Sequence, residues 1–272
     1  MDRYAAANLL NWDNRAELHA TDTTGMYRIA QVLAGGSSLH ALETSELGDI
    51  FGKDVVHLQC HNGLDTLSLK HLGARSVTGL DFSAQAIAAA RDFAERAGTE
   101  ARFVEASVYD APSALGETYD IAFVTWGAIN WLDDIAAWAR AVATVLRPGG
   151  RLYLLEGHPQ MSQYEAGERG LELAYDWRTP AEGPLMFDDP LTYTGDDRPL
   201  RHQRHYEWIH PLGSVINALI AAGMTIDFLN EHDTLVWNAF PGMVDRGGGQ
   251  LALPDDMVKV PLSYSIGATR KG

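Results

Sequence analysis

Between residues 54 and 155, short apolar runs alternate with segments of helical character, and this alternation limits the possible folds more than any other feature. The apolar runs occupy residues 55–58, 76–80, 101–105, 121–125 and 152–155. The segments 64–72, 84–97 and 133–146 place apolar residues at helical spacing. Strands and helices that alternate in this way form parallel βαβ units. The sequence therefore predicts an α/β fold with a doubly wound, Rossmann-like, mostly parallel sheet and helices on both faces.

The flanking segments follow other patterns. Residues 1–50 are mostly helical, and residues 157–210 interrupt the alternation with many Pro, Gly, His and aromatic residues. A helix opened by Pro211 comes next, and residues 225–229 and 263–269 are typical of an antiparallel pair of late strands. We predict a single domain with a core of residues 51–156 and 211–272, and an insertion of residues 157–210 after the fifth strand.

Charge and composition exclude several classes of partner. Lys and Arg number 21 against 36 Asp and Glu, for a net charge of -15, so a nucleic acid backbone would be repelled. No apolar run is long enough for a membrane span, and the first residues lack the order of a secretory signal, so we expect a cytoplasmic protein with no membrane contact. Cys60 is the single cysteine and is expected to be a buried filler.

A ligand site is expected where the strands of an open α/β sheet end. The loop 57–63 follows the first strand, and Asp81 ends the second strand, 18 residues after Gly63. A carboxylate at that position accepts hydrogen bonds from both hydroxyls of an adenosine ribose. This geometry alone also fits a nicotinamide cofactor.

Four blocks of sequence identify the ligand more closely. They read VVHLQCHNGLDTLSLKHLGARSVTGLDFSAQAIAAAR, FVEASVYDAP, DIAFVTWGAINWL and VLRPGGRLYLLEGHP. Together they resemble the class I S-adenosylmethionine-dependent methyltransferases, and most of all a bacterial small-molecule branch whose first loop reads HLQCHxGxDT. The resemblance covers roughly residues 8–160, and residues 205–232 more weakly. It implies S-adenosyl-L-methionine as the cofactor.

The first loop departs from the usual DxGCGxG pattern of that family. His57 replaces the acidic residue, Gln59 and His61 replace two glycines, and only Gly63 is kept. A loop with so little glycine cannot approach a pyrophosphate closely, which argues against a dinucleotide.

The resemblance also implies roles for individual residues. Arg15 would pair with the cofactor carboxylate from an N-terminal helical lid of residues 1–50, and Gln59 and His61 would bind the methionine part. Ser107 would meet the adenine amino group, with Val108 and Phe82 on the ring faces. The expected cofactor-binding residues are Trp12, Arg15, His19, Tyr27, Gln59, His61, Gly63, Asp81, Phe82, Ser83, Ser107, Val108, Thr125, Trp126 and Gly127.

Methyl transfer from a sulfonium requires alignment, exclusion of water and, for some acceptors, a base. We expect His158, at the rim after the fifth strand, to be that base. The insertion would form a substrate cap that binds a small aromatic or apolar acceptor. Its expected substrate-binding residues, with one from the fourth-strand loop, are Trp131, Tyr164, Trp177 and Tyr206.

Several alternatives remain open at this stage. The methylated atom is O, N or C, and the chain acts alone or as a homodimer. A nicotinamide-dependent oxidoreductase and a non-catalytic S-adenosylmethionine-binding protein are the competing functions. His57, His61 and His158 lack the spacing of a ligand set, so no metal site is expected.

Overall fold

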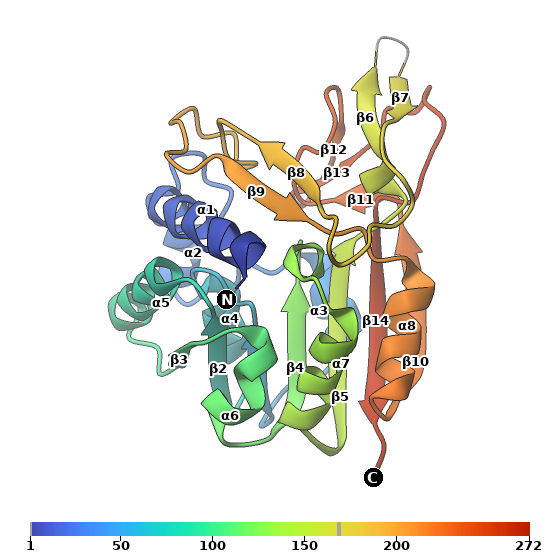
Figure 1. Ribbon diagram of the computed structural model, residues 1–272. Coiled ribbons are helices and arrows are strands. Elements are labelled where there is room, and N and C mark those ends of the chain that lie inside the picture. Colours follow the sequence, from blue (N-terminus) through green and yellow to red (C-terminus); the bar gives the residue numbers. More distant parts are fainter. Residues whose placement is uncertain (1, 168–169) are drawn as a thin grey trace.

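A seven-stranded sheet with the order β10-β14-β5-β4-β1-β2-β3 runs through the molecule (Figure 1). The computed structural model describes residues 2–167 and 170–272; Met1 of the predicted lid and residues 168–169 of the predicted insertion lie outside the described residues. The strands of the sheet are β1 (Asp54–Leu58), β2 (Ser76–Asp81), β3 (Arg102–Glu105), β4 (Tyr119–Thr125), β5 (Leu146–Gly157), β10 (Met224–His232) and β14 (Ser263–Arg270).

The directions of the strands confirm the predicted fold. β1 pairs in parallel with β2 and with β4, β2 with β3, and β4 with β5. β14 runs antiparallel to both of its neighbours, β5 and β10, as expected for the late strand pair. The strand order reverses between β1 and β4, and ligands of doubly wound sheets bind beyond the carboxyl ends of the strands at such a point.

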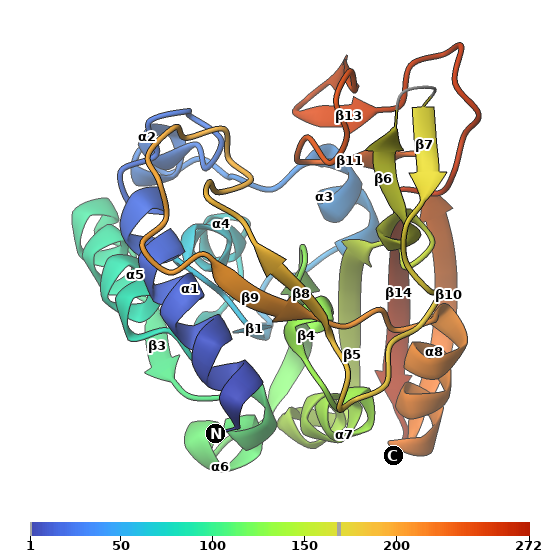
Figure 2. The same ribbon diagram turned by 45° about the horizontal axis from the view of Figure 1, so that its top comes forward.

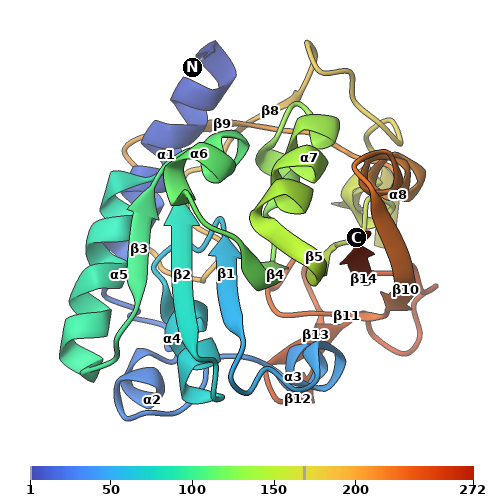
Figure 3. The same cartoon turned by 90° about the horizontal axis from the view of Figure 1, so that it is seen from below.

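Helices cover both faces of the sheet (Figure 3). One face packs against α6 (Ala111–Leu115), α7 (Ile135–Val145) and α8 (Leu212–Ala221), and its core includes the fully buried Trp138. The other face packs against α3 (Ala41–Leu47), α4 (Leu64–His71) and α5 (Ala84–Ala97). Leu47 of α3 belongs to the core of that second face, so this part of residues 1–50 is a helical layer of the core.

Two segments lie over the carboxyl ends of the parallel strands (Figure 2). The first, residues 157–210, contains η3 (Met161–Gln163) and the hairpins β6 (Tyr164–Gly167)–β7 (Gly170–Leu173) and β8 (Leu185–Asp188)–β9 (Arg204–Glu207). The second, residues 233–262, forms a three-stranded sheet of β11 (Thr234–Leu235), β12 (Val244–Gly247) and β13 (Gln250–Ala252). We call these two segments together the cap. The prediction assigned residues 233–262 to the core, and it missed this sheet.

The two segments of the cap share an apolar cluster. Met161 of the first segment packs with Leu235, Phe240, Leu253 and Leu262 of the second. This burial joins chain segments that are far apart in sequence, so the cap has a small core of its own.

The N-terminal helix α1 (Arg3–His19) is bound to the cap by three buried asparagines that repeat every three residues. Asn8 Nδ2 donates to the carbonyl oxygen of Tyr206, and the backbone amide of Tyr206 donates to Asn8 Oδ1, each at 2.8 Å. Asn11 Nδ2 donates to the carbonyl oxygen of His202 at 2.7 Å, and Asn14 Oδ1 accepts from a backbone amide of the same strand region. Asn8 thereby satisfies the free edge of β9 at Tyr206, and the other two asparagines bind the segment that precedes the strand. α2 (Ile29–Leu33) packs instead beside α4 and α5.

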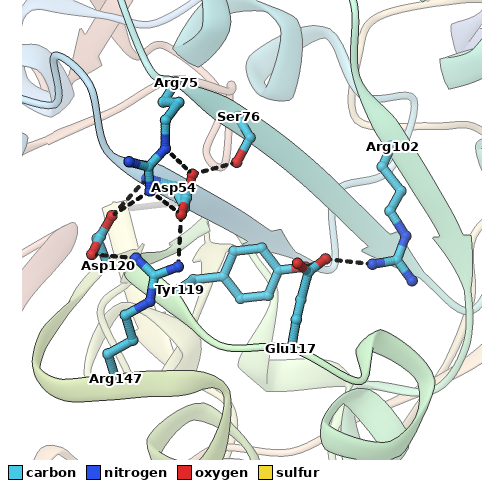
Figure 4. Close-up of polar contacts among 8 residues, drawn as sticks. All are labelled: Asp54, Arg75, Ser76, Arg102, Glu117, Tyr119, Asp120 and Arg147. Atoms are coloured by element: carbon cyan, nitrogen blue, oxygen red, sulfur yellow. Dashed lines mark hydrogen bonds and ion pairs between the residues drawn. The ribbon is translucent and has the colours of Figure 1, made fainter.

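A polar network connects the amino-terminal ends of the parallel strands, at the end of the sheet away from the cap (Figure 4). The carboxylate of Asp54 accepts from Arg75 Nε at 2.8 Å, from Arg147 Nη2 at 2.6 Å and from Ser76 Oγ at 2.7 Å. Arg147 also donates to Asp120 at 2.6 Å. Hydrogen bonding to Arg75 holds the pKa of Asp54 well below its usual value. The network therefore ties β1, β2 and β4 together on the side away from the cap.

None of the helices described is both long and apolar enough to span a bilayer. Within residues 2–167 and 170–272, no three His, Cys, Asp or Glu side chains gather in a way that would hold a metal ion.

Candidate functional site

A cavity of about 640 Å³ lies between the carboxyl ends of the parallel strands and the cap. Its floor comes from the loops after β1, β2, β4 and β5, and its sides come from α1, the 25–28 turn and the cap. Eleven of the residues expected at the site line it: Trp12, Arg15, Tyr27, Gln59, His61, Asp81, Phe82, Thr125, Trp126, Gly127 and Trp131.

The loop after β1 has left-handed backbone at three alternating positions. Gln59 has φ 56°, His61 has φ 49° and Gly63 has φ 74°. A side chain in this conformation costs about 1–2 kcal/mol per residue, and glycine avoids that cost. The Gln59 side chain offsets part of it by donating from Nε2 to the carbonyl oxygen of Ala128 at 2.6 Å. The chain thus adopts left-handed turns at two positions where the family pattern has glycine.

Asp81 is buried at the end of β2, facing this loop. One carboxylate oxygen accepts from the backbone amide of His61 at 2.8 Å, and the other accepts from that of Ser83 at 2.9 Å. Burial raises the pKa of Asp81 to about 6. The carboxylate is therefore oriented by the backbone, and no Lys or Arg among the described residues forms an ion pair with it.

Arg15 brings a buried cation to the same cavity from α1. Its side chain is held by a bond from Nε to Asn11 Oδ1 at 2.6 Å, and its guanidinium lies 5.7 Å from the Trp12 ring centroid and 5.8 Å from that of Tyr193. Only 3% of the residue is exposed, and none of the described carboxylates forms an ion pair with it. A buried cation without an anion is costly, so this position favours an anionic group from a ligand.

A chain of polar side chains connects α1 to the loop. His19 Nδ1 lies 2.9 Å from His61 Nε2 and 2.8 Å from the Tyr27 hydroxyl, which is 2.6 Å from the hydroxyl of Tyr193. Burial and then the charge of Arg15 lower the pKa of His61 to about 3. His19 does not form the cavity wall itself, and it positions His61 and Tyr27, which do.

Several buried polar atoms on the wall have no hydrogen-bond partner among the described residues. They are His57 Nε2, Gln59 Oε1, Asn62 Nδ2, Thr125 Oγ1 and Asn130 Oδ1. Buried polar groups are nearly always paired, so a run of unpaired ones around one cavity is what a polar ligand would satisfy.

Two buried carboxyl groups on the wall were missed by the sequence analysis. Glu43 accepts from Trp126 Nε1 at 2.7 Å, and its pKa is raised to about 8 by burial and by the nearby Asp65. Glu156, at the end of β5, accepts from the backbone amides of Ala128 and Ile129, and burial raises its pKa to about 7. Glu156 follows an apolar strand directly, and that signal was available in the sequence.

The cap also contributes residues that the sequence analysis did not identify. Asp189, Thr192, Tyr193, His205 and Glu207 all line the cavity. No motif marks them, because their positions depend on the path of the cap across the sheet.

Four of the five residues expected to bind the substrate or act as the base lie away from the cavity wall. Tyr164 packs in the apolar cluster of the cap, and Trp177 is 56% exposed beside a separate surface hollow. Tyr206 is turned toward α1, since its backbone is bound there and its ring packs edge-on against Tyr4 at 4.8 Å. The structure therefore does not bring these three to the predicted acceptor pocket.

His158, the expected base, is the fourth. The Gln160 amide donates to its Nδ1 at 3.0 Å, so Nε2 carries the hydrogen and donates to Glu231 at 3.0 Å. Both ring nitrogens are thus engaged away from the cavity, and His158 is not placed to receive a proton there.

Some expected cofactor residues support the site without forming its wall. Gly63 is the N-cap residue of α4, and a Cβ there would lie 2.6 Å from Phe103 Cε1. Ser83 caps α5 and donates to Asp13 at 2.6 Å. Ser107 caps η1 (Val108–Asp110), and Val108 is buried in the core under α7, so neither forms part of the cavity wall.

Comparison with known proteins agrees with this geometry. Residues 55–150 match the family described as a methyltransferase domain. The ubiquinone biosynthesis O-methyltransferase of Sodalis glossinidius is 31% identical over 161 residues, which cover 57% of this chain and 63% of that protein. The ribosomal protein L11 methyltransferase of Shewanella amazonensis is 32% identical over 127 residues, covering 45% and 41%. This chain spans about half the length of the curated relatives it matches.

Solved structures show the same fold. An S-adenosylmethionine-dependent methyltransferase from Mesorhizobium loti has a TM-score of 0.57 and 19% identity, and the match covers 83% of this chain and 94% of that one. A putative enzyme of the same kind from Listeria monocytogenes has a TM-score of 0.57 and 17% identity, with coverage of 84% and 95%. Residues 55–150 therefore match a methyltransferase domain, and the chain has the fold of the S-adenosylmethionine-dependent methyltransferases.

Proposed function

We propose that this protein transfers a methyl group from S-adenosylmethionine to a small molecule bound under the cap. The observation that carries the proposal is a pair of opposite charges on one cavity wall. Asp81 and Arg15 are both buried there, and neither is ion-paired with a described residue. S-adenosylmethionine carries ribose hydroxyls that suit the first and a carboxylate that suits the second.

The remaining wall residues fit the same ligand. Asp81 would accept from the ribose hydroxyls, and Arg15 would bind the amino-acid carboxylate, its guanidinium held against Trp12. The unpartnered Asn62 Nδ2 and Thr125 Oγ1 provide polar contacts for the methionine portion. When bound, the cofactor supplies an activated methyl group, and the protein holds it away from water.

A small acceptor is supported by the dimensions and walls of the cavity. Its volume of about 640 Å³ falls within the usual range for ligand pockets, roughly 300–1,000 Å³. Trp126, after β4, and Trp237, of the cap, meet edge-on at 5.9 Å and give the cavity an aromatic wall. One relative is named for ubiquinone biosynthesis and another for a ribosomal protein. The covered cavity favours a small molecule over a protein as the acceptor.

Calorimetry with two ligands tests this assignment. S-adenosylhomocysteine contains the ribose and the amino-acid part, whereas 5′-methylthioadenosine lacks the latter. We expect Asp81→Asn to weaken both ligands. Arg15→Leu should weaken only S-adenosylhomocysteine, by about 10- to 100-fold for a lost charged hydrogen bond.

Arg3→Leu is the matched control, because Arg3 is an exposed arginine of the same helix. It should leave both affinities unchanged. A wild-type protein that binds neither ligand would refute the proposed function, and equal losses for both ligands in Arg15→Leu would refute the role of Arg15.

A further inference from the structure

One histidine of the cap lies on the cavity wall with its ring held on both sides. His205, on β9, is 1% exposed, and its ring stacks on Phe187 at 5.4 Å and lies 5.2 Å from the ring of Trp131. It lines the cavity together with its neighbours Asp189 and Glu207. The ring is therefore fixed, and its surroundings decide what it can do.

The two ring nitrogens have different partners. Nδ1 lies 3.2 Å from the carbonyl oxygen of Gln203, which can only accept, so Nδ1 carries the hydrogen. In the neutral ring, Nε2 then has a free lone pair. That atom is 3.3 Å from Glu207 Oε1 and 3.7 Å from Asp189 Oδ2. A proton arriving at Nε2 would be stabilised by both carboxylates.

The strand that carries His205 is anchored beside the loop after β4, where the acceptor is expected. The backbone amide of Trp208, just after β9, donates to the carbonyl oxygen of Asn130 at 2.7 Å. Asn130 belongs to η2 (Ile129–Trp131), which follows β4. β9 is thus anchored to the loop after β4, and the end of that strand with the first residues of the loop, Thr125 to Gly127, lines the same cavity.

We propose, on the basis of the proposed function, that Nε2 of His205 takes the proton from a phenolic hydroxyl of the methyl acceptor. The acceptor oxygen forms its bond to the methyl carbon as its O–H bond breaks. The sulfur keeps the electron pair of the broken carbon–sulfur bond, and the proton moves to Nε2, where Glu207 and Asp189 stabilise the imidazolium.

The chemistry around Nε2 favours a hydroxyl over an amine. Two carboxylates would hold an amine as an ammonium ion, which has no lone pair to attack with. A neutral phenol gains no such stabilisation, and its aromatic body suits the tryptophan walls. A free phenolate would be repelled by the same carboxylates, so the proton has to leave during the reaction.

The other histidines of the cavity are poorly suited to this role. Burial lowers the pKa of both His57 and His61 to about 3, and burial also lowers that of His40. His57 Nδ1 is occupied by Thr66 at 3.0 Å, and His61 Nε2 by His19. Of the cavity histidines in the described part of the chain, His205 is the one with carboxylates beside its free nitrogen.

The test uses para-substituted phenols of graded acidity as acceptors, with radiolabelled S-adenosylmethionine as donor. A base matters most for an unactivated phenol, whose pKa is roughly 10, and least for 4-nitrophenol, whose more acidic hydroxyl gives up its proton readily without one. We expect His205→Gln to lower kcat by about 100- to 10,000-fold with phenol and much less with 4-nitrophenol. Its affinity for S-adenosylhomocysteine should stay within about twofold of wild type.

His202→Gln is the matched control, since His202 is an exposed histidine of the same segment. It should leave turnover of all phenols unchanged. A His205→Gln defect that is equal across the series, or absent, would overturn the proposal. The proposal would also be overturned if the wild type binds S-adenosylhomocysteine but methylates amines and no phenol, or methylates none of the acceptors tested. Failure to bind S-adenosylhomocysteine at all would instead refute the proposed function.

Discussion

Gly63, in the loop after β1, combines a left-handed backbone with no room for a side chain. It has φ 74°, and a Cβ there would lie 2.6 Å from Phe103 Cε1 and 2.7 Å from Ala90 Cβ. Gly63→Ala should therefore destabilise the protein in two ways. The left-handed backbone adds about 1–2 kcal/mol and the overpacking about 1–3 kcal/mol, which together lower the free energy of unfolding by about 2–5 kcal/mol.

Two other glycines separate these contributions. Gly116 has φ 69° and open space where its Cβ would lie, so Gly116→Ala should show the backbone contribution alone, about 1–2 kcal/mol. Gly79 on β2 has no positive φ, but a Cβ there would lie 2.7 Å from Cys60 Sγ and 2.7 Å from Phe103 Cδ1. Gly79→Ala should show the packing contribution alone, about 1–3 kcal/mol.

Urea unfolding followed by Trp fluorescence and by far-UV circular dichroism measures all three variants, and agreement of the two signals checks that unfolding is two-state. The loss for Gly63→Ala should approach the sum of the other two. A Gly63→Ala variant no less stable than Gly116→Ala would refute the argument that this turn is packed against Phe103 and Ala90.

Two further predictions concern buried or paired groups elsewhere. Arg75 holds the pKa of Asp54 below its usual value, so the charged carboxylate stabilises the native state above about pH 3.9 and this stabilisation is lost as the pH falls toward the lowered native pKa. Asp54→Asn should therefore lower the free energy of unfolding at neutral pH, and the difference in this free energy between variant and wild type should narrow in acid. Urea titrations that give the same difference at neutral and at acid pH would contradict this. Burial keeps Cys60 enclosed and raises its pKa, so its thiol should react with Ellman's reagent only after unfolding, and release of the chromophore from native protein would show otherwise.

Local sequence patterns were sufficient for the sheet and for the floor of the cavity. The apolar runs predicted β1, β2, β4 and β5, and motif spacing placed Asp81 and the Gln59 loop at their carboxyl ends, where the structure has them. The match of residues 55–150 to methyltransferase domains favours that function over the oxidoreductase that the strand-end carboxylate alone allowed.

The cap was not predictable in the same way, because long-range packing decides it. Tyr206 and Glu207 are adjacent on β9, and the pairing of that strand with α1 turns Tyr206 toward the helix and leaves Glu207 on the cavity wall. His158 follows an obvious strand end, yet its bonds to Gln160 and Glu231 turn it away from the cavity. Side-chain alternation along such short strands gives no sign of which face will be covered.

The asparagines of α1 have a consequence for the entry of ligands. Because Asn8, Asn11 and Asn14 bind the backbone of the β9 region, the helix and the hairpin are joined as one body. That body carries both Arg15 and His205, which face the cavity from the helix and from the strand. If the helix and the hairpin move away from the sheet together, Arg15 and His205 leave the cavity at the same time. Cofactor binding and proton removal would then be lost in the same motion.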